Sequence, residues 1–390
     1  MHEDTLALLK LVLAGGAVAP RRGLLDAHGT PARSLAVGAS AWRAAGLSEA
    51  QIQHIRQPDN DLLQRSCRWL EQSSHHLLGW HDPDYPPLLR RIGSPPLALF
   101  VDGDPSLLWR AGVAVVGSRS PTAGGRDNAY AFARALAASG TAVISGMAAG
   151  IDAAAHEAAL AAPQGVTVAV LGTGPDLAYP PHHAGLRDRI AAQGAVVSEH
   201  PPGTQARPAH FPSRNRILAG LALGTLVVEA TERSGALITA RQAGDNGREV
   251  FAVPGSIHNP LSRGCHRLIR EGAGLVENAQ EVLDALVPMA SELADFLRGR
   301  LAGSLARPHI GADNALAPLN PDYQPLWLAL GHDPTGMDSL VERTGLTAAE
   351  LSSMLLVMEL DGLVTAEHGR YQRKTGFFTS TASMTQAEGQ

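Results

Sequence analysis

A chain of 390 residues in which 45% of the residues are hydrophobic is long enough for two or three folding units with sizeable cores. Aromatic residues make up only 4%, so these cores must be built mainly from Ala, Val, Leu and Ile. The formal net charge of -5 argues against a protein that binds polyanions over its whole surface. Any nucleic-acid site must therefore be local.

The two cysteines, Cys67 and Cys265, lie far apart and form no Cys-X-X-Cys pair. This spacing indicates neither a disulfide framework nor a structural zinc site. The first residues lack the basic stretch of a secretion signal, and no apolar run approaches the ~18 residues that a membrane span needs. We therefore expect a cytoplasmic protein without a membrane partner.

Residues 1–75 show short helical patterns separated by glycine and proline, which predict a small helical domain. Within it, Ser48 precedes Gln51 at the capping-box spacing that marks a helix start. Residues 81–105 contain six prolines, so we expect neither a long helix nor a central strand there. The apolar residues 97–101 are expected to add one edge strand to the domain that follows.

Six apolar, β-branched runs then alternate with helical stretches. The runs are residues 113–116, 142–144, 166–171, 195–197, 225–228 and 250–253. This alternation is typical of a parallel sheet with helices on both faces. The class is therefore α/β, with an open, doubly wound parallel sheet over residues 76–290.

The C-terminal part looks looser in composition and then helical again. Residues 291–325 are rich in Gly, Pro and Ala and are expected to form a linker. Residues 326–374 combine helical patterns with a strand-turn-strand, the layout of a winged helix. Residues 375–390, rich in Ser, Thr and Gln, are expected to be disordered.

Glycine-containing turns follow several of the expected strands. Because parallel strands end at one edge of the sheet, these turns gather where ligands of open α/β folds bind. Glycine lets the backbone approach a ligand, and each following helix offers free N–H groups at its positive end. The turns suggest an anion site, and their residues of interest are Gly117, Ser118, Arg119, Gly146, Gly172 and Gly174.

A dinucleotide cofactor is the main competing ligand for such an edge. Gly172 and Gly174 match the first two glycines of that fingerprint, but Leu177 stands at the third position and Pro175 disturbs the helix start. The domain has no lysine for a Walker-type loop and no G-x-S-x-G elbow. Its histidines show no i, i+4 ligand spacing with a carboxylate partner. We therefore expect neither a cofactor nor a metal.

Residues 211–220 are the most informative stretch. Pro212 and Ser213 are expected to begin a helix, which places Arg214 and Arg216 in its first turn, where cations oppose the helix dipole. A bound anion would relieve that repulsion. Ser234 and Gly235 are expected to begin another helix, with backbone amides suited to a second phosphate. Residues 201–270 hold nine arginines against four acids, so a basic stripe exists inside an acidic protein.

Five segments together resemble the DNA-processing protein A family, called DprA or Smf. They are residues 115–119, 145–152, 211–220, 234–240 and 250–255. The resemblance covers roughly residues 79–286 and implies an extended Rossmann-like domain that binds single-stranded DNA and forms a homodimer. It also implies that the protein protects incoming DNA and loads the RecA recombinase during natural transformation. The flanking parts resemble a sterile-alpha-motif-like domain and a winged helix.

The resemblance and the residue patterns together define one expected site without a catalytic residue. DNA binding is assigned to Gly117, Ser118, Arg119, Gly146, Gly172, Gly174, Phe211, Arg214, Asn215, Arg216, Ser234, Gly235, Thr239 and Arg241. Few aromatic residues lie near these loops, so backbone contacts should dominate and binding should tolerate any sequence.

Two further expectations concern a competing enzymatic function and the partner of the winged helix. A nucleotide-processing enzyme of the lysine-decarboxylase-like phosphoribohydrolase type shares this broad fold, and Glu229 matches its glutamate, but Ser234-Gly235-Ala236 stands in place of its P-G-G-x-G-T loop.

In the winged helix, the expected recognition helix, residues 347–360, contains Glu350 and Glu359 and no basic residue. We therefore expect this domain to contact protein rather than duplex DNA.

Overall fold

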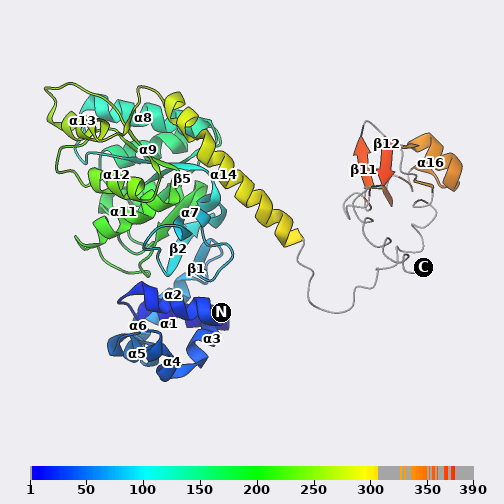
Figure 1. Cartoon of the computed structure of the whole chain (residues 1–390), viewed down its shortest axis with the longest axis horizontal. Helices are drawn as coiled ribbons and strands as arrows, with labels where there is room; N and C mark the ends of the chain where they lie inside the picture. The colour runs from blue at the N-terminus through cyan, green and yellow to red at the C-terminus, as the bar shows by residue number, and fades with distance from the viewer. Residues whose placement is uncertain are drawn as a thin grey trace, which may run out of the picture. The chain divides into compact units, whose positions relative to one another are not determined.

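The computed structural model describes residues 2–305 and, beyond them, residues 326, 329–330, 335–348, 351, 354–355, 358, 364–367 and 370–373. The chain divides into two compact units, Met1–Leu305 and Ala306–Gln390, each treated separately below (Figure 1). The expected tail, residues 375–390, lies outside the described residues, as do residues 306–325 of the expected linker.

Six short helices open the larger unit. They are α1 (Glu3–Leu13), α2 (Val18–His28), α3 (Pro31–Ala36), α4 (Gly38–Ala44), α5 (Glu49–Arg56) and α6 (Asn60–Trp69). The capping box is confirmed, because Ser48 Oγ accepts from the Gln51 amide at 3.3 Å and Gln51 Oε1 accepts from the Ser48 amide at 3.0 Å. Leu11, Leu25 and Trp42 pack in a core that also includes Ala98 of the sheet.

A nine-stranded sheet follows. Its strands are β1 (His75–Gly79), β2 (Ala98–Gly103), β3 (Gly112–Val116), β4 (Ala142–Ser145), β5 (Thr167–Leu171), β6 (Ala195–Ser198), β7 (Gly224–Val227), β8 (Glu249–Ala252) and β9 (Gly274–Leu275), in the order β1-β2-β6-β5-β4-β3-β7-β8-β9. From β6 to β9 all neighbours are parallel, which confirms the predicted class.

The strand expected at residues 97–101 is not an edge strand. β2 lies inside the sheet, antiparallel to β6 on one side and to β1 on the other, with Leu77 opposite Phe100. The edge position belongs to β1, whose sequence His75-His76-Leu77-Leu78-Gly79 gives a weak strand signal by itself. Pairing with β2, whose residues 98–101 are apolar and buried, supplies what that local sequence lacks.

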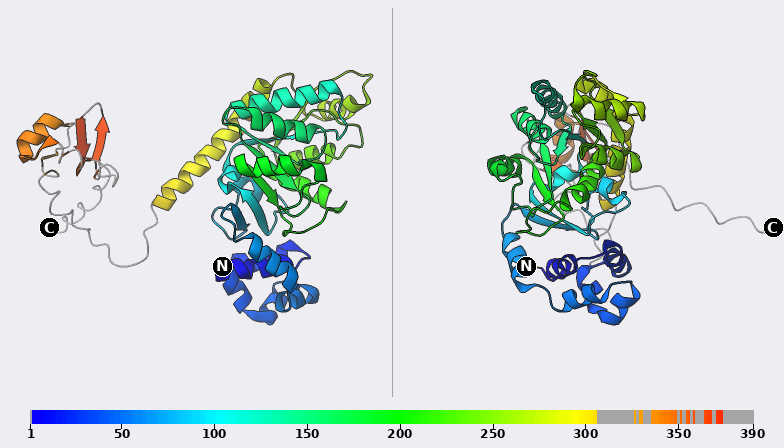
Figure 2. Two further views of the ribbon diagram at one scale, coloured as in Figure 1. Left: turned by 180° about the vertical axis from the view of Figure 1, so that it is seen from behind. Right: turned by 90° about the vertical axis from the view of Figure 1, so that its left-hand side faces the viewer.

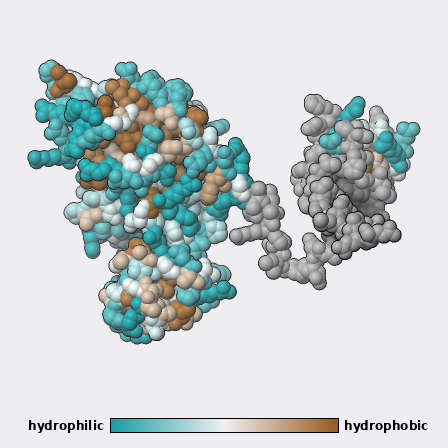
Figure 3. Space-filling view, viewed as in Figure 1, coloured by the Kyte–Doolittle hydropathy of each residue, from teal (hydrophilic) through white to brown (hydrophobic). Residues whose placement is uncertain are grey.

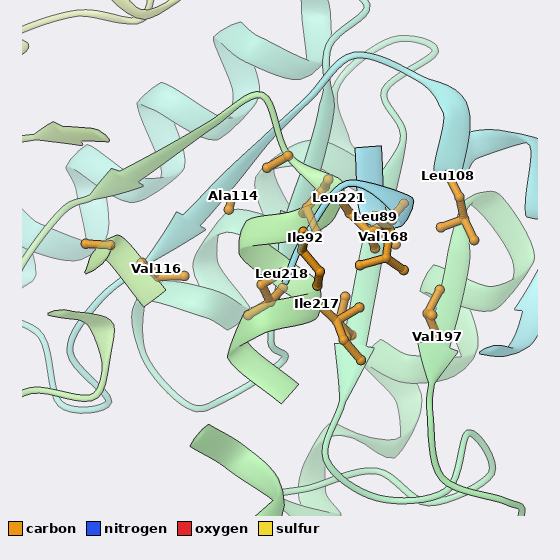
Figure 4. Close-up of a cluster of buried hydrophobic side chains, with 14 of the residues drawn as sticks. Leu89, Ile92, Leu108, Ala114, Val116, Val168, Val197, Ile217, Leu218 and Leu221 are labelled. Atoms are coloured by element: carbon orange, nitrogen blue, oxygen red, sulfur yellow. The ribbon is translucent and has the colours of Figure 1, made fainter. Parts of the chain in front are cut away.

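Helices cover both faces of the sheet (Figure 2). One face carries α8 (Ala123–Ala138), α9 (Ile151–Ala161), α10 (Ala184–Gln193) and α14 (Ala279–Leu305), and the other carries α7 (Pro87–Arg90), α11 (His210–Leu221), α12 (Ala236–Asp245) and α13 (Arg263–Arg270). In β3, Val113 and Val115 pack toward α8, whereas Ala114 and Val116 pack under α11 (Figure 4). Because both faces are buried, the strands read as continuous apolar runs.

Helix α14 continues through a stretch that the composition predicted as linker. It runs to Leu305 with Pro288 inside it, so residues 291–305 are helical. Leu293 is buried and Leu297 is half-buried against the cluster that includes α8. Arg300 donates to the Pro83 carbonyl at 2.5 Å, and its guanidinium lies 4.5 Å from the Trp109 ring centre. The packing of Leu293 and Leu297 explains why the helix does not end at residue 290.

The described residues of the smaller unit include a complete helix, further helical residues and a three-stranded antiparallel sheet. It contains β10 (Thr335–Gly336), α16 (Met337–Thr344), β11 (Val364–Glu367) and β12 (Arg370–Arg373), with strand order β10-β12-β11. Leu340, Leu355 and Val364 are buried in its core. These elements confirm the expected helix and strand-turn-strand of a winged helix. Glu350 and Glu359 of the expected recognition helix lie outside the described residues.

The face of the larger unit seen in Figure 3 is mostly hydrophilic, with small apolar patches between the polar residues. Among the described residues, no helix combines the length and the apolar character needed to cross a membrane.

Candidate nucleic-acid interface

A cavity of about 550 Å³ lies at the carboxyl edge of the parallel strands, where ligands of open α/β folds bind. We call it the edge pocket. Its walls come from the turn after β3, from the start of α9 and from the first turns of α11 and α12. They comprise Val116, Gly117, Arg119, Ala148, Asp152, Tyr179, Pro208, Phe211, Pro212, Arg214, Asn215, Leu218, Ser234, Gly235, Ala236, Ile238 and Thr239.

Arg214 forms the buried floor of the edge pocket, with only 4% of its surface exposed. Helix α11 begins at His210, not at Pro212 as predicted, so Arg214 lies in the second turn and points inward. Its Nη1 donates to the Gly146 carbonyl at 2.7 Å and also to the Val170 carbonyl. Burial lowers the pKa of Arg214 to about 10, so the guanidinium stays charged at neutral pH.

The orientation of Arg214 leaves donor capacity unused. Among the described residues its buried Nε has no hydrogen-bond partner. A buried, charged donor without an acceptor is costly, and an anion in the pocket is one way to lower that cost. Gly146 makes this position possible, because a Cβ there would lie 2.5 Å from the guanidinium carbon. Gly146 therefore contributes to the site by leaving room for the Arg214 side chain.

The turn after β4 does not offer free amides to a ligand. The N–H groups of Gly146 and Ala148 donate to Asp152 Oδ2 at 3.1 Å and 3.3 Å. Burial raises the pKa of Asp152, an effect that the charge of Arg214 and these two hydrogen bonds oppose. The protein's own carboxylate thus fills the anion nest that the glycine pattern predicted. Asp152 was missed as a site residue, although an acid in a first helical turn after glycine is a visible signal.

Arg119 is the exposed cation of the edge pocket. Its guanidinium carbon lies 5.7 Å from the ring centre of Phe211, and the described residues offer it no hydrogen bond or ion pair. Gly117 allows the turn to pass close to α9, since a Cβ there would lie 2.7 Å from Ile151 Cγ1. Ser118 Oγ accepts from the Ser120 amide at 3.2 Å, which shapes the turn. Arg119 is therefore free to meet an anion.

The start of α12 supplies the opposite wall. Ser234 Oγ accepts from the Ala236 amide at 3.3 Å, while Gly235 provides no side-chain cap. Within the described residues the Gly235 amide has no acceptor, so the positive end of the helix dipole faces the pocket unneutralised. Thr239 lies one turn further and is buried beside the same pocket.

Arg216 does not line the edge pocket. Its Nη1 and Nη2 donate to Glu199 at 2.8 Å and 2.6 Å, and its Nε donates to the Ser94 carbonyl at 2.9 Å. Burial of Glu199 would raise its pKa, but the hydrogen bonds and charge of Arg216 outweigh burial, so the pKa is lowered. Both side chains are less than one-fifth exposed. Arg216 is engaged as a structural ion pair.

Ser118 and Gly146 adjoin the edge pocket without lining it, and three other predicted residues also lie outside its walls. Gly172 stands behind Phe211, and its carbonyl accepts from His210 Nδ1 at 2.9 Å. Gly174 is buried and its amide donates to the Thr204 carbonyl at 2.9 Å. Arg241 lines a separate cavity of about 350 Å³ that also contains Arg267. The structure thus brings together Gly117, Arg119, Phe211, Arg214, Asn215, Ser234, Gly235 and Thr239.

The pocket has two aromatic side chains at its rim. The rings of Tyr179 and Phe211 are 5.0 Å apart and tilted by 42°. Phe251, a third aromatic residue near these loops, belongs to β8, is 3% exposed and packs in the core instead.

Glu229, the residue that favoured a nucleotide-processing enzyme, is not free. Its carboxylate accepts from the Thr122 amide at 2.9 Å, from Thr122 Oγ1 at 2.7 Å and from Asn259 Nδ2 at 3.2 Å. With 6% exposure it caps the start of α8. A carboxylate held in this way is poorly placed to act on a substrate.

A larger cavity of about 1030 Å³ lies where α6 and α10 meet the first strands. Four carboxylates line it, those of Asp102, Asp104, Asp176 and Asp188, against one arginine, Arg187. These carboxylates would repel the negative phosphates of a nucleic acid, so this cavity is not the nucleic-acid site although it is larger than the edge pocket.

The loop histidines make backbone contacts. His183 Nδ1 donates to the Met147 carbonyl at 2.9 Å, as His210 does to Gly172. In the part of the chain that the structure describes, no three His, Cys, Asp or Glu side chains are placed to hold a metal ion.

Two family models and several curated relatives match this chain. The family described as DNA recombination-mediator protein A matches residues 76–287, and the DprA winged helix domain matches residues 311–370. Protein Smf of Escherichia coli is 38% identical over 344 residues, which cover 86% of this chain and 87% of the relative. DNA processing protein DprA of Streptococcus pneumoniae is 48% identical over 202 residues, which cover 52% of this chain and 71% of the relative.

Two solved structures share the fold. The X-ray structure of DprA from Streptococcus pneumoniae aligns with a TM-score of 0.65 at 37% identity and covers 73% of this chain and 98% of its own. A structure of DNA processing protein A from Helicobacter pylori, described in terms of its single-stranded DNA binding mode, aligns with a TM-score of 0.50 at 27% identity. It covers 55% of this chain and 96% of its own.

Proposed function

This chain belongs to the DNA recombination-mediator protein A (DprA/Smf) family, and from that premise we propose that it binds single-stranded DNA through phosphate contacts in the edge pocket. One observation carries the proposal. The unpaired Arg119, the buried Arg214 and the uncapped start of α12 all face one cavity. Fixed guanidinium groups and a free helix N-terminus are the donors that phosphate oxygens take.

Binding through these groups does not depend on base sequence. Phosphate contacts fix the position of a strand but carry no sequence information. Tyr179 and Phe211 are the aromatic side chains at the pocket, and stacking is worth about 1–3 kcal/mol per base whatever the base. Affinity should therefore fall with salt and differ little between oligonucleotides of different composition.

The binding test is fluorescence anisotropy with single-stranded and duplex oligonucleotides at two salt concentrations. Arg119→Ala should weaken single-strand binding at least tenfold, whereas Arg241→Ala, which removes an exposed arginine outside the edge pocket, should bind as the wild type does. Equal binding by the Arg119 variant and the wild type, or wild-type preference for duplex, would remove the proposal.

The wider role follows from the family. We infer that the protein acts in the cytoplasm during natural transformation, protects the incoming single strand and loads RecA onto it, without catalysing a reaction itself. Its family names and the phosphate-binding geometry support this role. RecA-catalysed strand exchange should be faster with the wild type than with Arg119→Ala. Equal rates would separate RecA loading from DNA binding.

We also propose that the protein works as a homodimer and that the smaller unit contacts protein rather than duplex DNA. Light scattering on the full chain should give twice the monomer mass with and without DNA. A monomer at micromolar concentration would contradict the first part. The second part is tested by the deletion described in the Discussion.

A further inference from the structure

Exposed arginines flank the edge pocket on both sides. Arg207 lies in the loop before α11, Arg233 in the turn before α12, and Arg263 at the first position of α13. Their neighbours in sequence, Pro208 and Ser234, line the pocket itself. Within the described residues, no guanidinium of these three makes a hydrogen bond or an ion pair.

Hydrogen bonds place these arginines along the sheet edge. His210, whose amide donates to the Arg207 carbonyl at 3.0 Å, is bound through Nδ1 to Gly172 after β5. The Gly264 amide, next to Arg263, donates to the Ala230 carbonyl after β7 at 2.8 Å. Arg207 therefore stands by the end of β5, and Arg263 by the end of β7.

The sheet order gives the distance between the two ends. β5 and β7 are separated by β4 and β3, and Arg119 follows β3. Neighbouring strands are about 4.8 Å apart, so the ends of β5 and β7 are roughly 14 Å apart. A strand stacked as in a duplex rises about 3.4 Å per nucleotide and a more extended strand rises further, so the span corresponds to at most about four nucleotides.

Few carboxylates oppose these charges at this edge. Within residues 201–270, Asp245 and Glu249 follow the end of α12 and begin β8, so they belong to the amino edge. Glu229 is buried and bound to Thr122. Glu232 is exposed, and its charge acts on Arg267 of α13. Of the acids that follow β5 and β6, Asp176 accepts from the Gly203 amide and Glu199 is paired with Arg216, so neither neutralises the exposed arginines beyond the pocket.

We propose that Arg207, Arg233 and Arg263 extend the edge pocket into a phosphate track, along which at most about four nucleotides cross the sheet edge from β5 to β7. This inference rests on the proposed function. The pocket residues hold the central phosphate, whereas the flanking arginines hold neighbouring phosphates from solvent-exposed positions. Contacts of that kind are screened by salt, so they contribute more to salt dependence than to affinity at high salt.

The test measures dissociation constants for a fluorescent eight-nucleotide thymidine strand between 50 and 200 mM NaCl. We compare the wild type with Arg207→Gln, Arg233→Gln, Arg263→Gln and the triple variant. Each single change should reduce the slope of log affinity against log salt by about 0.7, and the triple change by about 2. The affinity deficit of the triple variant should therefore shrink roughly twentyfold between the two salt concentrations.

Arg241→Gln is the matched control, because it removes one exposed arginine of α12 away from the track. Its slope should equal the wild-type slope. If the triple variant keeps the wild-type slope while Arg119→Ala loses binding, the track is refuted and the pocket stands. If Arg241→Gln changes the slope as much as the track variants do, the effect is one of net charge and the track is also refuted. If the wild type does not bind the strand, the proposed function itself fails.

Discussion

Replacing Gly146 by alanine tests whether the position of Arg214 creates the edge pocket. A Cβ on residue 146 would lie 2.2 Å from Nη1 of Arg214 and 2.5 Å from its guanidinium carbon, so the group must retreat by about 1.2 Å to restore ordinary contacts of 3.4 Å. That movement stretches the bond from Nη1 to the Gly146 carbonyl beyond hydrogen-bonding distance and weakens the bond to the Val170 carbonyl. The added methyl group thus acts on the arginine without removing its charge.

The cost follows from the bond to Gly146 that is lost and the bond to Val170 that is weakened. A hydrogen bond made by a charged group is worth about 1.5–3 kcal/mol, and a buried guanidinium that loses its acceptors keeps its desolvation penalty. We therefore expect Gly146→Ala to lower the free energy of unfolding by about 3 kcal/mol. Single-strand affinity should fall at least tenfold, because the displaced arginine no longer faces the phosphate.

Urea unfolding followed by circular dichroism measures the stability change. Gly244→Ala is the control, since Gly244 lies in α12 with no atom within 4 Å of its missing Cβ and should be stabilised by about 0.5–1 kcal/mol. In an Arg214→Ala background the steric conflict disappears, so Gly146→Ala should then cost less than about 1 kcal/mol. Additive costs in the double variant would refute this account.

Three further predictions concern stability and the smaller unit. Glu199→Ala leaves the mostly buried Arg216 without its carboxylate and should cost about 3 kcal/mol in urea unfolding, with much of the loss restored in Glu199→Leu/Arg216→Met; an additive double variant would contradict this. Burial lowers the pKa of His156 to about 3 in the folded chain. The unfolded chain therefore binds a proton near pH 6.5 while the folded chain stays neutral there, so the free energy of unfolding decreases as pH falls below about 6.5. His156→Gln should reduce the loss between pH 6.5 and 4.5 by about 2 kcal/mol, and an unchanged pH profile would argue against it. Deleting residues 326–390 should leave single-strand anisotropy binding within twofold of wild type, and a tenfold loss would show that the smaller unit binds DNA.

The sheet was predictable from sequence because its strands are buried on both faces. Burial on both faces leaves continuous apolar runs such as Val113–Val116, and the runs also define which turns gather at the carboxyl edge. Arg119 and Gly235 were placed correctly in the pocket because both lie directly in those turns. For these two residues the local sequence pattern was enough to predict their position in the fold.

The errors arose where distant residues decide the structure. The start of α11 moves to His210, whose ring binds the carbonyl of Gly172, and no nearby residue signals that bond. Arg216 is engaged by Glu199, seventeen positions earlier, for the same reason. By contrast, α14 had a readable signal in the spacing of Leu286, Leu293 and Leu297, which the Gly and Arg content obscured.

The two arginines of the edge pocket differ in freedom, and this difference has a kinetic consequence. Arg119 is exposed and makes no hydrogen bond within the described residues, so it can meet a strand that is still diffusing, whereas Arg214 is held by two carbonyls and has little side-chain entropy left to lose. Rim charges govern mainly association, and buried charges govern mainly dissociation. Arg119 should therefore set how quickly the protein captures a strand, and Arg214 should set how long it keeps it.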